Sequence, residues 1–120
     1  MRKILVVDDD KDMSFMMERL LSSHHYEVVT AFNGLEAIEK TKESRIDLIL
    51  MDVRLPYFSG FWFCDVFKKK PETKDIPVVF MSALSDEENV RKAMNMGAKA
   101  YLKKPFNLDE LLRVVESAFI

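Results

Sequence analysis

Four apolar segments of this 120-residue chain each run directly into polar residues. Residues 4–7 precede three aspartates, residues 48–51 precede Asp52, residues 78–81 precede Ser82, and residues 101–102 precede two lysines. Short apolar runs of this kind are typical of strands that are buried on both faces of a parallel sheet. Because ligands bind beyond the carboxyl ends of such strands, we expect carboxylates, a hydroxyl and an ammonium group to gather around one crevice.

Helical patterns alternate with these strands. Apolar residues recur at helical spacing after the first strand and near the end of the chain, at Met13, Met16, Met17, Leu20, Leu21 and at Leu108, Leu111, Leu112, Val115. Three further helices are expected after Asn33-Gly34, from Ser59-Gly60 to Pro71, and over residues 86–96 before Gly97. Residues 27–31 are predicted to form a more polar edge strand. Five strands alternating with five helices predict an α/β fold, a doubly wound parallel sheet with helices on both faces.

Composition limits the remaining possibilities. The chain has no repeat and no linker, so residues 1–120 are expected to form one domain. No apolar stretch approaches the roughly 20 residues that a bilayer requires, and the start shows no signal peptide, so a cytoplasmic protein is expected. The net charge of -2 argues against general nucleic-acid binding. The single Cys64 excludes an internal disulfide and a structural zinc site, and we expect a thiol in the core.

The loop after the first strand distinguishes between chemistries that share this architecture. A dinucleotide-binding fold needs a glycine-rich turn there, but the three glycines are Gly34, Gly60 and Gly97. The aspartates at 8–10 would repel a flavin phosphate unless a metal intervened. Adjacent carboxylates with Asp52 facing them suit a hard divalent cation, which takes oxygen ligands. The sequence therefore predicts a magnesium site at this end of the sheet.

The order and spacing of these residues resemble those of the receiver domain of two-component response regulators, over essentially the whole chain. The motifs that carry the resemblance are Val7-Asp8-Asp9, Met51-Asp52, Leu55-Pro56 with Gly60, Ser82-Ala83, Gly97-Ala98 and Tyr101 through Lys104-Pro105-Phe106. The resemblance implies a flavodoxin-like fold with strand order 2-1-3-4-5. It also implies a phosphoacceptor domain that promotes its own phosphorylation and dephosphorylation, and not an enzyme in the usual sense.

The resemblance implies a role for each residue of the crevice. Asp52 would accept the phosphoryl group, Asp9 and Asp52 would bind Mg²⁺ together with the backbone carbonyl of Arg54, and Asp8 would act mainly through bound water. Lys104 would neutralise phosphoryl oxygens as negative charge spreads over them in the transition state.

Three further features are implied at the neighbouring strand ends. The peptide bond from Lys104 to Pro105 would be cis. Ser82 would hydrogen-bond the phosphoryl group, and Tyr101 would change rotamer in response, so that these two residues form a switch.

The implied partners are a sensor histidine kinase or a histidine phosphotransfer domain, which would contact Phe15 on the first helix. Signal output would pass to a domain or protein through the fourth helix, the fifth strand and the fifth helix, with no direct nucleic-acid or membrane binding by this chain. Lys99 and Ala100 stand where regulators that dimerise through this surface commonly carry acidic residues, which puts that dimer mode in doubt. The sequence assigns no role to Trp62 and leaves open whether the chain stands alone or belongs to a larger regulator or hybrid kinase.

Other interpretations remain open. Asp8 and Asp10 have the spacing of a haloacid-dehalogenase-type phosphatase with Asp8 as nucleophile, but Asp12 stands where a hydroxyl or small apolar residue is expected and a cap domain has no room. A degenerate receiver that binds partners without phosphorylation is a third possibility. Asp9 or Asp10 could simply cap the first helix. Lys103 is expected to be a solvated charge at a strand end.

Overall fold

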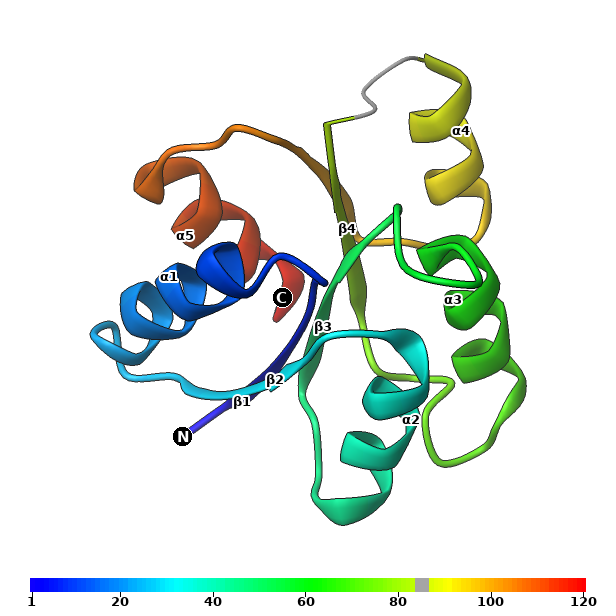
Figure 1. Ribbon diagram of the computed structural model, residues 1–120, viewed down its shortest axis with the longest axis horizontal. Helices are drawn as coiled ribbons and strands as arrows, with labels where there is room; N and C mark the ends of the chain where they lie inside the picture. Colours follow the sequence, from blue (N-terminus) through cyan, green and yellow to red (C-terminus); the bar gives the residue numbers. More distant parts are fainter. Residues whose placement is uncertain (84–86) are drawn as a thin grey trace.

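The computed structural model describes residues 1–83 and 87–120 of the chain. Strands and helices alternate without exception through the described residues (Figure 1). The strands are β1 (Lys3–Val7), β2 (Glu27–Ala31), β3 (Leu48–Asp52), β4 (Val78–Ser82) and β5 (Ala100–Lys103). The helices are α1 (Lys11–Ser22), α2 (Gly34–Glu43), α3 (Gly60–Lys69), α4 (Glu87–Asn95) and α5 (Leu108–Ala118).

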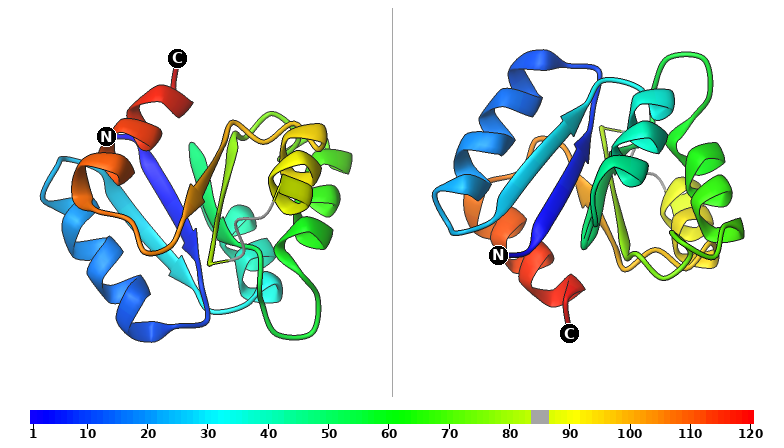
Figure 2. Two further views of the ribbon diagram at one scale, coloured as in Figure 1. Left: turned by 90° about the horizontal axis from the view of Figure 1, so that it is seen from above. Right: turned by 90° about the horizontal axis from the view of Figure 1, so that it is seen from below.

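The strands form one parallel sheet in the order β2-β1-β3-β4-β5, which confirms the predicted fold. Helices α1 and α5 cover one face, and α2, α3 and α4 cover the other (Figure 2). None of the helices in the described part of the chain has the length and apolar content needed to span a bilayer.

Successive side chains of the central strands point to opposite faces of the sheet and form two separate cores. In β3, Ile49 and Met51 pack against α2 to α4, whereas Leu48 and Leu50 pack against α1 and α5. All four side chains are fully buried, and each contributes about 1.5–3 kcal/mol of transfer free energy. The residue after Met51 is Asp52, so the buried strand carries a carboxylate directly to the edge of the core.

The first helix is turned relative to the prediction. We expected Met16 to face the core, but its side chain is 42% exposed, and the buried residues of α1 are Ser14, Met17 and Leu21. The physical reason is the buried hydroxyl of Ser14, which donates a hydrogen bond to the backbone carbonyl of Asp8. This contact turns the helix so that Met16 points away from the sheet.

Most predicted helix ends are confirmed. Asp10 caps α1 by accepting from the backbone N–H of Met13, and Ser59 caps α3 in the same way. Gly97 has a φ of 88°, the left-handed conformation expected after the fourth helix. The predicted start of that helix at Asp86 lies outside the described residues.

Candidate functional site

Four strand ends build the candidate site. Asp8 follows β1, Asp52 ends β3, Ser82 ends β4, and Lys104 follows β5. These strands are neighbours in the sheet, so residues separated by nearly the whole sequence meet at one edge. The expectation that the strand ends bring carboxylates and an ammonium group together is confirmed.

The Lys104 ammonium group lies between two buried carboxylates. It donates to Oδ2 of Asp8 at 2.7 Å and to Oδ2 of Asp52 at 2.9 Å. The Asp8 side chain is completely buried, and Asp52 is only 7% exposed. Two carboxylates this close would repel each other strongly in a region with little water, so the lysine holds the pair together.

Backbone N–H groups hold the second oxygen of each carboxylate. The N–H of Asp10 donates to Oδ1 of Asp8 at 3.0 Å, and the N–H of Arg54 donates to Oδ1 of Asp52 at 3.1 Å. Every oxygen of this pair therefore accepts a hydrogen bond, and the two side chains have fixed orientations before any ligand arrives.

Burial and ion pairing shift the pKa values of Asp52 and Lys104 in opposite directions. Burial raises the pKa of Asp52, and the charge of Asp8 adds to that effect, whereas the hydrogen bond and charge of Lys104 act against it. The net direction is upward. Burial alone would lower the pKa of Lys104, but its bonds to Asp8 and Asp52 outweigh burial and raise that pKa. The lysine therefore remains charged at neutral pH.

Asp9 completes an acidic cluster with Asp8 and Asp52. One oxygen from each carboxylate lies within 4.8 Å of the others, a spacing that would let them surround a single cation. Asp9 is exposed whereas the other two are buried, so the cluster is open to solvent on the Asp9 side. Oxygen ligands of this kind suit a hard divalent ion.

The loop after β3 closes tightly over Asp52. The N–H of Gly60 donates to the carbonyl of Val53 at 2.8 Å. A Cβ atom at position 60 would overlap the backbone carbonyl of Asp52, so only glycine allows this approach. The same turn carries the Arg54 N–H that orients the Asp52 carboxylate.

The other residues expected around the crevice differ in how deeply they are buried. Ser82 is buried, and Tyr101 is partly buried against the core formed with α2 to α4. The peptide bond between Lys104 and Pro105 is cis, as expected. Lys103 is exposed, as expected for a solvated strand-end charge.

Two aromatic residues on the helices, Phe15 and Trp62, are exposed. Phe15 is 59% exposed on α1, with the Arg19 guanidinium 5.7 Å from its ring centroid. Trp62 stacks on Phe58 with ring centroids 4.4 Å apart and remains half exposed. Stacking on a neighbouring ring gives Trp62 a structural contact that the sequence did not reveal.

Two elements of the site were missed by sequence reasoning. The direct bond from Lys104 to Asp8 was not expected, because Asp8 was assigned only a role toward the metal, mainly through bound water. Ser14, which anchors the Asp8 backbone, was also missed. Its spacing of three and seven residues from Met17 and Leu21 places it on the buried face of α1 and could have revealed it.

Replacing Lys104 tests the electrostatic account. We expect Lys104→Met to lower the free energy of unfolding at pH 7 by roughly 3–5 kcal/mol without metal, because two buried carboxylates lose their shared cation. Without Lys104, the pKa of Asp52 in the folded state should rise further. The folded state should then bind a proton more tightly, so the loss of unfolding free energy should shrink as the pH falls through that raised pKa. Urea unfolding at several pH values measures this, with Lys103→Met as the exposed control. An equal, pH-independent loss in both variants would contradict the account.

Comparison with known proteins identifies the family. Residues 4–116 match the response regulator receiver domain. The transcriptional regulatory protein CrdR of Helicobacter pylori is 40% identical over 112 residues, which cover 92% of this chain and 51% of CrdR. The chain thus spans about half the length of the first curated relatives it matches.

Solved structures agree with this match. The chemotaxis protein CheY4 of Vibrio cholerae superposes with a TM-score of 0.93 at 32% identity over 98% of each chain. The response regulator TrrA of Thermotoga maritima, solved in complex with Mg²⁺-BeF, gives a TM-score of 0.86 at 32% identity over 98% of this chain and 99% of its own. The chain therefore belongs to the response regulator receiver domain family and is a phosphoacceptor in two-component signalling.

Proposed function

We propose that Asp52 is the residue that accepts the phosphoryl group. The observation that carries this proposal is the Lys104 bridge, because Asp52 is the one member of the acidic cluster that is both bonded to this cation and not sealed from solvent. Asp8 shares the lysine, but its side chain has no exposed surface. Asp9 is exposed, and no bond joins it to Lys104 among the described contacts. Burial of Asp8 also argues against the phosphatase alternative, in which Asp8 would be the nucleophile.

The transfer reaction follows from this geometry. A carboxylate oxygen of Asp52 attacks the phosphorus of a phosphohistidine, the phosphorus–nitrogen bond breaks, and the histidine nitrogen leaves with its electron pair. The product is an acyl phosphate on Asp52. The Lys104 ammonium exchanges a carboxylate contact for an oxygen of the phosphoryl group and stabilises the charge that spreads over it. The Arg54 N–H keeps the nucleophile oriented.

The acidic cluster fits Mg²⁺. Asp9 and Asp52 would hold the ion directly with the backbone carbonyl of Arg54, and Asp8 would act mainly through bound water. When bound, the ion would neutralise the like charges that otherwise oppose the approach of a phosphoryl group. The close spacing of the three carboxylates supports this proposal.

The receiver domain implies a histidine kinase partner, and we propose that the phosphodonor is that kinase or a histidine phosphotransfer domain. The exposed ring of Phe15 on α1 is a contact for this partner, since α1 begins beside the crevice. Output would pass through α4, β5 and α5 to a further domain or protein, with residues 1–120 acting as the receiver unit. A cytoplasmic location stays a prediction.

We further propose that Ser82 and Tyr101 form the switch. Ser82 lies at the end of β4, the strand next to β3, which ends at Asp52. Tyr101 on β5 pairs with Phe80 on β4. A hydrogen bond from Ser82 to the phosphoryl group would draw Ser82 inward. The space vacated behind it would favour an inward Tyr101 rotamer, and each movement would stabilise the other.

Phosphorylation should be confined to Asp52. Incubation with acetyl phosphate and Mg²⁺, followed by intact-mass measurement, should add one phosphoryl group to the native chain and none to Asp52→Asn, because the amide is not a nucleophile. A phosphorylated Asp52→Asn chain with the label on Asp8 would support the phosphatase interpretation, and no reaction with the native chain would support a degenerate receiver.

Magnesium should stabilise the native chain through Asp9. An ion that binds the folded state alone raises the melting temperature by mass action. We expect a clear rise on adding Mg²⁺ to the native chain and a much smaller rise for Asp9→Asn. Asp12→Asn is the matched control, because Asp12 is an exposed carboxylate in the first turn of α1 and should leave the response intact. Equal responses in all three proteins would remove Asp9 from the metal site.

The switch can be followed by backbone amide shifts. Beryllium fluoride with Mg²⁺ should shift the amides of α4 and those around Tyr101 in the native chain. Ser82→Ala should still bind the anion but lose most of these shifts, whereas the control Ser117→Ala on α5 should keep them. If Ser82→Ala reproduces the native pattern, the coupling does not pass through this hydroxyl.

A further inference from the structure

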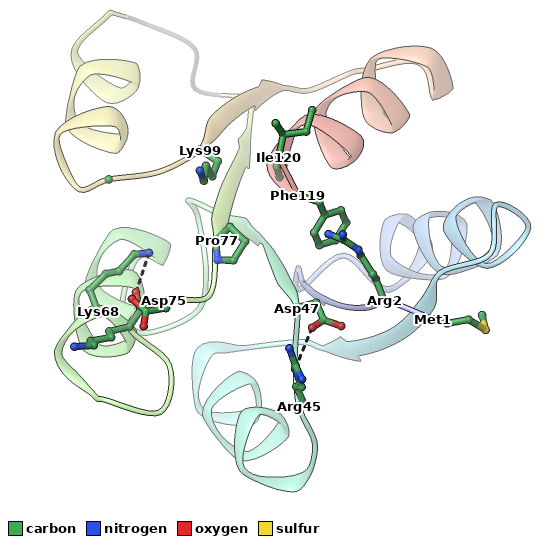
Figure 3. A pocket seen from close by; sticks show the side chains of 13 residues that line it. Met1, Arg2, Arg45, Asp47, Lys68, Asp75, Pro77, Lys99, Phe119 and Ile120 are labelled. Carbon is green, nitrogen blue, oxygen red and sulfur yellow. Dashed lines mark hydrogen bonds and ion pairs between the residues drawn. The ribbon is translucent and has the colours of Figure 1, made fainter.

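A second concave region lies at the opposite end of the sheet, where the strands begin (Figure 3). It has a volume of about 940 Å³ and is lined by residues near both ends of the chain and by the segments that lead into β3, β4 and β5. We call it the basic cavity. Its basic side chains are those of Arg2, Arg45, Lys68, Lys74 and Lys99, and its acidic side chains are those of Asp47 and Asp75.

The charges of the basic cavity are not balanced within the chain. Asp47 is already engaged, since its oxygens accept from the backbone N–H of Lys3 at 2.8 Å and from Arg45 at 3.3 Å. Among the described residues, neither Lys74 nor Lys99 has a carboxylate within ion-pair distance of its ammonium group. With five basic and two acidic side chains in its lining, the cavity is positive although the chain as a whole carries a net charge of -2.

Compensation of helix dipoles explains only part of this clustering. Cations near a helix C-terminus offset its negative end. Lys68 fits that explanation, because it lies in the last turn of α3 and donates to the carbonyl of Ile76 at 3.2 Å. Arg2, Lys74 and Lys99 do not belong to any helix. Helix dipoles therefore do not explain why these three residues lie around the basic cavity.

Arg2 lies against an aromatic ring at the wall of the basic cavity. Its guanidinium carbon lies 4.1 Å from the centroid of the Phe119 ring, and Figure 3 shows the two side chains together at the wall of the cavity. Contact with the ring restrains the side chain, and a guanidinium group carries several N–H donors in a fixed plane. Such a group recognises phosphate oxygens with less loss of side-chain entropy than a freely moving one.

We propose that the basic cavity binds a small polyanion that carries two or more phosphate groups. The volume lies within the range of small-molecule sites, roughly 300–1,000 Å³, and guanidinium and ammonium groups are the side chains that phosphates prefer. The site lies at the end of the sheet away from Asp52 and does not depend on phosphorylation. Arg2 binds through the N–H donors at the edge of its guanidinium plane, and Lys74 and Lys99 supply charge that no carboxylate of the described chain satisfies.

Titration with inorganic tripolyphosphate tests the proposal. In low salt with EDTA, which removes any metal from the acidic cluster, the probe should shift the backbone amides of Arg2, Gly97 and Lys99 in a saturable manner, with no shift around Asp52. The double variant Lys74→Glu/Lys99→Glu should weaken binding at least tenfold. The matched control is Arg91→Glu/Arg113→Glu, which makes the same change in net charge at two exposed positions on α4 and α5 and should bind as the native chain does.

The control separates a defined site from general electrostatic attraction. Equal weakening in both double variants would show that only net charge matters and would overturn the proposal, as would amide shifts scattered over the surface. Circular dichroism would establish that both variants are folded. Binding to vesicles of anionic lipid with no response to tripolyphosphate would show a membrane-binding surface instead, which also contradicts the proposal.

Discussion

The bridge formed by Lys104 between Asp8 and Asp52 is the interaction on which the rest of the site depends. It joins the ends of β1, β3 and β5, three strands that are far apart in the sequence. Without the ammonium group, two nearly buried carboxylates would face each other with little solvent to screen them. The folded state accepts this acidic pair because the cation is present, and the pair in turn keeps the lysine charged.

The same interaction prepares the site for chemistry. Hydrogen bonds from the Arg54 and Asp10 backbones hold the outer oxygens of the two carboxylates, so the side chains need little rearrangement when a ligand binds. A phosphoryl group that enters the crevice offers Lys104 an alternative anionic partner. In the proposed function, the cation would then pass from stabilising the resting protein to stabilising the transferred phosphate, and this exchange would connect folding energetics with function.

Much of this arrangement follows from the sequence for a simple reason. Parallel strands all point one way, so polar residues that end apolar runs must meet, and the amino-acid order alone places Asp8, Asp52, Ser82 and Lys104 together. The rotation of α1 does not follow in this way. Its apolar residues alone put Met16 toward the core, but a single buried hydroxyl on Ser14 turns the helix. Bonds between side chains of distant residues, such as that from Lys104 to Asp8, depend on small differences in distance and leave no periodic pattern in the sequence.

The most direct test is a crystal structure of the chain with Mg²⁺ and beryllium fluoride. The account predicts beryllium bonded to an oxygen of Asp52, the metal between Asp9, Asp52 and the Arg54 carbonyl, and the Lys104 ammonium in contact with a fluoride after giving up a carboxylate. Beryllium on Asp8 or Asp9, or a Lys104 side chain that keeps both carboxylate bonds and does not approach the fluoride, would contradict it.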